Sequence, residues 1–219
     1  MSILPSALIC AADWPTFGHD PQRSGWAFEE STLAAGNVAG LELKWKTQVK
    51  NQSRALSAVT APVVAGGVVT AKGIKTLVYV AGTANNFFAL EAENANVVWD
   101  KTFDIHVLPK GADFWSCPNG ITATPTIDRT RSMVYVIAVD GRVFGLDLGS
   151  GEIKFGPIAF VPPYAKTWSL NLWGGRHLHL YFTGVWWRPV GDLCYGCPRP
   201  TPRTNPKLAD CGLVCFRES

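Results

Sequence analysis

The chain has 219 residues, of which 47% are hydrophobic, and this is enough for a substantial core. It contains no uninterrupted apolar run of about 18 residues, so the sequence excludes an ordinary transmembrane helix. The formal net charge of +3 lies entirely in residues 173–219, which hold six Lys/Arg and three Asp/Glu, whereas residues 1–172 are balanced. A neutral body excludes a basic surface for nucleic acid, so we expect a protein or small-molecule partner and no nucleic acid.

The first twelve residues, Met1 to Ala12, are apolar and end in small residues. We interpret residues 1–12 as the remnant of a secretory signal peptide, which predicts a periplasmic or secreted protein. The segment lacks the basic residues that normally open such a peptide, so a buried N-terminal strand remains the alternative.

The next segment, residues 13–26, is rich in Pro, Gly and aromatic residues and is predicted to be an ordered surface loop. His19 and Asp20 form a conceivable catalytic pair, but Asp20 precedes Pro21, which favours a turn role. Residues 31–40 are predicted to form a short helical turn. Residues 41–49 alternate apolar and polar side chains and predict a strand.

The central feature of the chain is a repeat, because Leu77 to Trp99 aligns without a gap with Met133 to Phe155. Each copy reads as three short strands separated by turn residues. In the second copy the first turn is Asp140-Gly141, which predicts a type I′ hairpin with positive φ at both residues. A three-stranded unit cannot bury both of its faces alone, so the repeat predicts sheets stacked on one another.

A further strand is predicted before each repeat. Residues 60–69 and 123–128 each contain a proline followed by an apolar run, and they predict the innermost strand of a four-stranded unit. The two units then cover residues 60–103 and 122–157. Residues 41–49 resemble the outermost strand around Trp99, but no hairpin precedes them. A ring that is closed by strands from both ends of the chain would have such a single strand at its N-terminal side. The long insertion at residues 102–120 falls where binding loops occur.

These repeats resemble those of pyrroloquinoline quinone (PQQ) β-propellers, on the pattern V-Y-V, D-G, L-D, G and W/F seen at residues 133–155. The opening Trp14-Pro-Thr-Phe-Gly-His-Asp20 is also similar to that of bacterial PQQ-like proteins. The resemblance covers residues 13–172 and implies an all-β fold, a partial propeller of four-stranded antiparallel blades. Propellers have about four to eight blades, and at about 40–50 residues per blade this chain is too short to close the ring.

Residues 173–219 depart from the repeat and are predicted to be an irregular tail. Four of their side chains, listed here, suit tetrahedral zinc: His177, His179, Cys194 and Cys197. Cys211 and Cys215 offer a second pair. The alternative is that the tail is translated out of frame after about Leu172, because dropping one base at Trp173 permits a reading with V-I-Y-T, a Gly-rich loop and I-Y-A-M-D. On that hypothesis the chain is truncated and its apparent zinc ligands are accidental, so no metal site is assigned.

Three functions remain open. The favoured one is a fragment of an exported PQQ-like propeller that acts as a binding scaffold with no catalytic residues. The second is a fragment of a PQQ-dependent dehydrogenase, for which the resemblance implies PQQ and calcium; Trp115 or Trp168 would stack on the quinone, although core packing is the favoured role for both. The third is a zinc-binding protein that uses the tail. The resemblance also leaves open a disulfide from Cys117 to a cysteine of the frame-restored sequence. No cofactor-binding residue is identified.

Overall fold

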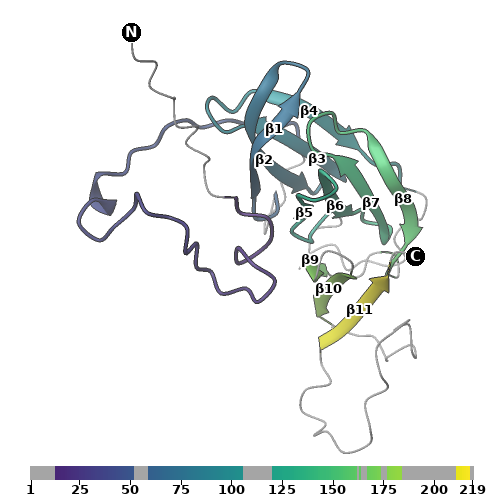
Figure 1. Cartoon of the computed structure of the whole chain (residues 1–219). Coiled ribbons are helices and arrows are strands. Elements are labelled where there is room, and N and C mark those ends of the chain that lie inside the picture. Colours follow the sequence, from purple (N-terminus) through teal and green to yellow (C-terminus); the bar gives the residue numbers. More distant parts are fainter. Residues whose placement is uncertain are drawn as a thin grey trace, which may run out of the picture.

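The computed structural model describes residues 13–51, 59–105, 120–161, 163, 167–173, 177–183 and 211–217. These residues form three antiparallel sheets, shown in Figure 1. Blade 1 contains, in spatial order, β1 (Val63–Thr70), β2 (Gly73–Gly82), β3 (Asn86–Glu91) and β4 (Val97–Thr102). Blade 2 contains β5 (Thr126–Asp128), β6 (Met133–Ile137), β7 (Arg142–Asp147) and β8 (Ile153–Ala159). The third sheet contains β9 (Thr167–Trp173), β10 (His177–Thr183) and β11 (Cys211–Arg217). The predicted all-β fold of four-stranded antiparallel blades is confirmed.

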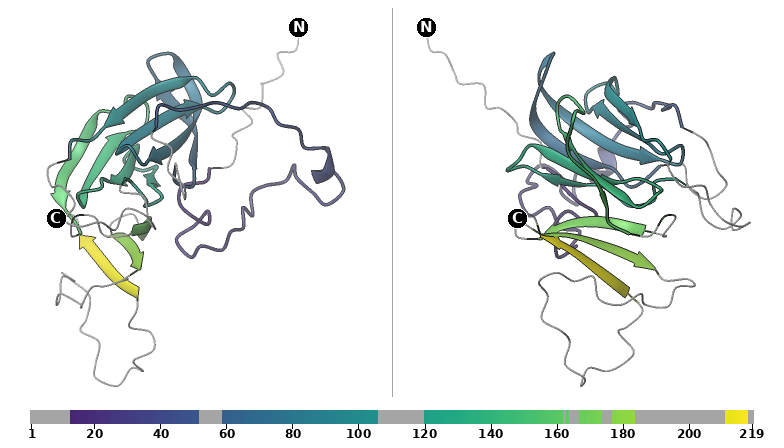
Figure 2. Two further views of the ribbon diagram at one scale, coloured as in Figure 1. Left: turned by 180° about the vertical axis from the view of Figure 1, so that it is seen from behind. Right: turned by 90° about the vertical axis from the view of Figure 1, so that its right-hand side faces the viewer.

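The three sheets lie side by side in chain order and spread outward from a common inner side (Figures 1 and 2). The innermost strands β1 and β5 contact each other, and β5 also contacts β9. A parallel bridge joins Thr124, just before β5, to Ser169 of β9. The first strand of each sheet therefore lies at this inner side, which is the arrangement of the blades in a propeller.

Equivalent residues of the two blades lie 56 positions apart in the sequence. The backbone conformation of the turns is repeated as well. Gly141 has a φ of 83°, and its counterpart Asn85 has a φ of 58°. Gly151 at 69° likewise corresponds to Ala95 at 60°. Asn is among the residues that tolerate positive φ, which explains how Asn85 replaces a glycine.

The hairpin at Asp140-Gly141 differs from the type I′ turn that the sequence predicts. Among its central residues only Gly141 has a positive φ. The amide of Gly141 donates to the carbonyl oxygen of Ala138 at 2.9 Å, and the amide of Ala138 donates to that of Arg142 at 2.9 Å. This is a longer loop, a type I turn closed by a left-handed residue. Both the two-residue type I′ loop and this longer loop fit the right-handed twist of the paired strands. The Asp-Gly pair therefore does not by itself determine the length of the loop.

The core lies between the sheets. Residues of β2 and β3 that point to one side, such as Tyr79 and Phe87, pack against Val136 and Leu146 of blade 2. The opposite side of blade 2, including Tyr135 and other residues of β6 and β7, packs against Leu170 of β9. Strand alternation thus gives each blade two apolar faces, each of which needs a neighbouring sheet.

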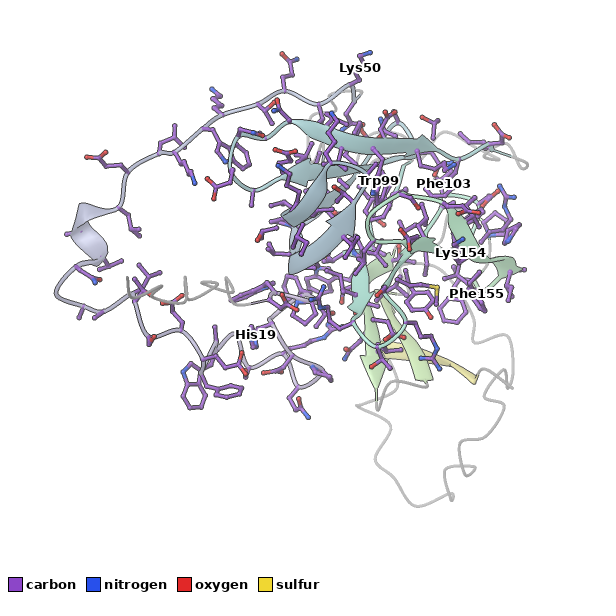
Figure 3. The ribbon with its side chains drawn as sticks, turned by 45° about the horizontal axis from the view of Figure 1, so that its top comes forward. His19, Lys50, Trp99, Phe103, Lys154 and Phe155 are labelled. Carbon is purple, nitrogen blue, oxygen red and sulfur yellow. The ribbon has the colours of Figure 1, made fainter. Side chains whose placement is uncertain are left out.

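Residues 24–43 extend away from the sheets and return as an extended segment along blade 1 (Figures 1 and 3). The predicted helical turn is present as a short 3-10 helix at Val38–Gly40. The prediction of a strand at residues 41–49 is wrong within the described residues, because this segment pairs with no other strand there. A strand requires a partner, and the alternation of its side chains does not supply one.

Candidate functional site

The opening segment, residues 13–21, crosses the inner strands of all three sheets. It bonds to them in turn: Trp14 exchanges two backbone hydrogen bonds of 2.9 Å with Val64, the Pro15 carbonyl oxygen accepts from the Ile127 amide at 2.8 Å, and the Thr16 hydroxyl donates to the Leu170 carbonyl oxygen at 3.0 Å. The loop predicted from the Pro, Gly and aromatic residues is therefore ordered by long-range contacts.

Polar side chains gather where this segment meets β9, and we call Arg23, Ser169 and Asn171 the inner polar cluster. Arg23 Nη2 donates to the Ser169 hydroxyl at 2.5 Å. The Asn171 side-chain amide donates to the Pro21 carbonyl oxygen at 2.8 Å. The His19 ring packs edge-on against Trp14, with ring centroids 5.1 Å apart. Figure 3 shows His19 on the opening segment.

Buried polar atoms without a hydrogen-bond partner among the described residues include Asn171 Oδ1 of the inner polar cluster and His19 Nδ1 of the opening segment. Buried polar atoms in folded proteins are normally hydrogen-bonded, to protein or to ordered water. Asn171 Oδ1 accepts hydrogen bonds, whereas His19 Nδ1 accepts or donates according to its protonation. The cluster is therefore suited to a small hydrogen-bonding group, such as a water molecule or a ligand hydroxyl.

The turn role predicted for Asp20 is confirmed. Its carboxylate accepts hydrogen bonds from the amide and the hydroxyl of Ser24. These bonds, the hydroxyl bond first, lower the pKa of Asp20 below its usual value. His19 Nδ1 lies 4.0 Å from the Asp20 carboxylate, which is too long for a hydrogen bond. The two residues therefore do not form a catalytic pair in this arrangement.

The acidic residues of blade 2 serve its turns. Asp128 pairs with Arg131 at 2.8 Å, and Asp140 pairs with Arg142 at 2.7 Å. Asp147 accepts hydrogen bonds from the amides and hydroxyl of the turn that follows β7. Asp140 therefore belongs to the turn predicted at Asp140-Gly141, and Asp147 ends β7 and stabilises the turn that follows it.

The core-packing role preferred for Trp168 is wrong. Its side chain is 62% exposed, although Leu170 on the same strand is buried. Trp168 is the second residue of β9 and lies near the end of the sheet. There the alternation of side chains along the strand does not ensure that a side chain is buried by a neighbouring element. Trp115, the other tryptophan considered for quinone stacking, and Cys117 lie outside the described residues.

The residues offered as zinc ligands are only partly described. His177 and His179 lie on β10, and the backbone register places His179 opposite Cys215 and Thr183 opposite Cys211 on β11. Cys194 and Cys197 lie outside the described residues. No group of three or more His, Cys, Asp or Glu side chains gathers in the part of the chain whose side chains are described.

Comparisons with known proteins connect this arrangement to solved structures. No protein-family profile matches the chain, and no curated protein matches it. A quinohemoprotein alcohol dehydrogenase from Comamonas testosteroni is similar over 78% of this chain, with 19% identity and a TM-score of 0.55. A second quinohemoprotein alcohol dehydrogenase, from Pseudomonas putida, is similar over 79% of the chain, with 15% identity and a TM-score of 0.52. BamB from Moraxella catarrhalis matches over 55% of the chain and 31% of its own, with 17% identity and a TM-score of 0.33.

The chain spans 23% of the length of each of the two dehydrogenases. Within its described residues no helix is long and apolar enough to cross a membrane. At these identities the similarity concerns the fold, and it agrees with the blade order and with the inner strands described above. The chain is a partial β-propeller with the quinoprotein-like fold.

Proposed function

We propose that the chain is part of an exported PQQ-like propeller that serves as a binding scaffold and has no catalytic site of its own. The main support for this proposal is the structural role of three acidic side chains, Asp128, Asp140 and Asp147. Each is occupied by a turn or an ion pair within its own blade. Charged groups held in this way stabilise the blades, while the inner polar cluster offers hydrogen-bonding atoms to a ligand.

A quinone-binding assay tests the proposal. Purified protein is incubated with PQQ and Ca²⁺, dialysed, and measured for quinone absorbance and for oxidation of primary alcohols with an artificial electron acceptor. The scaffold function predicts neither retained quinone nor alcohol oxidation. Retained quinone with turnover would contradict it and would establish the second function.

The second function, a fragment of a PQQ-dependent dehydrogenase, is favoured by the similarity to two quinohemoprotein alcohol dehydrogenases. Calcium in proteins takes about six to eight oxygen ligands. The described residues do not fit this ion, because no group of three or more acidic or other metal-binding side chains gathers among them. We therefore derive no catalytic step through PQQ or calcium. The third function, zinc binding by the tail, is checked by metal analysis of the same preparation.

The export part of the proposal rests on residues 1–12 and has its own test. Expression in a Gram-negative host, followed by cell fractionation and N-terminal sequencing, should find the chain in the periplasm or medium, beginning near Asp13. Recovery of the intact N-terminus in the cytoplasm would contradict export.

A further inference from the structure

Residues 26–43, which we call the arm, leave the sheets and return to blade 1 (Figures 1 and 3). Every residue from Phe28 to Leu43 is exposed. This includes the large apolar side chains, since Phe28 and Leu43 are 67% and 81% exposed. The arm contains a short 3-10 helix at Val38–Gly40 and no strand. It is therefore a long exposed connection between two parts of the chain that are held by the sheets.

The hydrogen bonds of the arm are internal. The Glu30 carboxylate accepts from the amide of Thr32 at 2.5 Å. The Asn37 side chain accepts from the Ala34 amide at 2.8 Å and donates to the Thr32 carbonyl oxygen at 2.7 Å. Among the described residues, no hydrogen bond joins residues 27–43 to a blade. Opening of the arm therefore breaks no hydrogen bond to a sheet, and segments of this kind open locally at a low cost in free energy.

Both flanks of the arm are held by the sheets. On the N-terminal flank, the opening segment bonds to the inner strands of all three sheets, and Arg23 Nη2 donates to the Ser169 hydroxyl at 2.5 Å. On the C-terminal flank, the indole Nε1 of Trp45 donates to the carbonyl oxygen of Ala92 at 2.8 Å. A break within the arm therefore leaves each flank attached to the sheets.

The glutamates of the arm are accessible, whereas those of the blades are held. An endopeptidase binds its substrate as an extended chain, so it cuts exposed segments that open locally. Glu29 and Glu30 are neighbours in the exposed arm, which contains no Lys or Arg for a protease directed to basic residues. Glu91 is 8% exposed at the end of β3. Glu152 lies in the turn directly before β8 and pairs with Lys154 at 2.7 Å.

We propose that the arm is a processing site, at which an endopeptidase hydrolyses the peptide bond after Glu29 or Glu30 and produces a two-chain protein. The reaction consumes one water molecule, which gives the glutamate an α-carboxylate and the next residue an amine. The N-terminal product stays bound across the inner strands through Trp14, Pro15 and Thr16. Once the covalent connection is cut, this product is held by its own affinity and no longer by a high effective concentration. Processing therefore converts the opening segment from a tethered peptide into an exchangeable one.

Limited digestion of the full chain with a glutamate-specific endopeptidase tests the cleavage. The chain has seven glutamates, of which all but the last lie in the described residues: Glu29, Glu30, Glu42, Glu91, Glu93, Glu152 and Glu218. Mass spectrometry of the products over time should find the cuts of the arm, after Glu29, Glu30 and Glu42, before any cut in the blades. The double variant Glu29→Gln, Glu30→Gln should retain only the cut after Glu42 within the arm. The chain unfolded in urea is the control and should be cut in the blades as well.

Size-exclusion chromatography of the cut protein tests whether its two chains stay together. They should elute together at the volume of the uncut chain and separate in urea. Thr16→Val removes the hydroxyl that bonds to the Leu170 carbonyl oxygen and keeps the shape of the side chain. The uncut Thr16→Val chain should elute as the wild type does, whereas its cut form should release the N-terminal product faster on dilution. Thr32→Val, in the exposed arm, is the matched control and should retain this product as the wild type does.

An arm that resists the protease in the folded chain, under conditions that cut the unfolded chain, would overturn the proposal. So would cuts after Glu91 or Glu152 that appear as early as those in the arm. Loss of the N-terminal product from the wild-type protein as soon as it is cut would also overturn the proposal, because the opening segment would then depend on its covalent connection.

Discussion

Trp99 is the residue that most clearly connects the two blades. Its ring packs edge-on against Phe87 at 5.5 Å, and its indole donates to the carbonyl oxygen of Leu148. Replacing a buried tryptophan with alanine costs about 3–5 kcal/mol, so Trp99→Ala should lower the free energy of unfolding by about that amount in urea titrations. Trp26 is 70% exposed, and Trp26→Ala should change it by less than about 0.5 kcal/mol. Equal losses in the two variants would show that Trp99 does not hold the interface.

Tyr79 makes the stability of the protein sensitive to alkaline pH. Burial raises the pKa of Tyr79 above its ordinary value of 10.0, and its hydroxyl donates to the carbonyl oxygen of Leu148. The unfolded chain releases the phenolic proton near pH 10 while the folded chain retains it, so the free energy of unfolding should fall as pH rises above about 10. Tyr79→Phe should flatten this fall in denaturant titrations between pH 9 and 11, by an amount measured against the wild type. An unchanged slope would contradict the assignment.

The turns of the blades are constrained at particular glycines, and two of them separate backbone strain from crowding. Gly151 has positive φ, and a Cβ there would lie 2.6 Å from Cδ2 of Trp99. Gly67 also has positive φ, but a Cβ there would meet nothing within 4 Å. Gly67→Ala should cost about 1 kcal/mol through strain alone, and Gly151→Ala should cost about 1–3 kcal/mol more through overpacking. Thermal unfolding of both variants checks this order, and a reversed order would contradict it.

At the scale of the elements, the sequence predicted the strands well where a repeat supported them. The matching runs at residues 77–99 and 133–155 lie within β2 to β4 and β6 to β8, because each apolar position is fixed by the neighbouring sheet. Residues 41–49 have the same alternation but remain unpaired among the described residues, since pairing depends on a partner that local sequence does not encode. The inner polar cluster was not predicted for a similar reason. Pro21 and Asn171 are 150 positions apart, and no local pattern connects them.

At the scale of the whole molecule, the origin of residues 173–219 remains a prediction. Sequencing the DNA across the codons for residues 171–175 should reveal one inserted or missing base if the tail is out of frame. The restored frame should then encode further repeats, which would fill the place before blade 1 within the same chain. A confirmed frame would contradict the out-of-frame hypothesis and make zinc analysis of the tail the next measurement.

The opening segment, which bonds to the inner strands of all three sheets, has a consequence for the order of folding. The Thr16 hydroxyl meets the carbonyl oxygen of Leu170, 154 positions away. Contacts of such long sequence separation form late, because the chain between them must be ordered first. During synthesis, residues 13–21 leave the ribosome well before β9, yet they cannot complete their contacts until β9 has emerged. A segment that is made early is thus fixed in place late, and until then the inner edges of the blades stay accessible to chaperones or to a ligand.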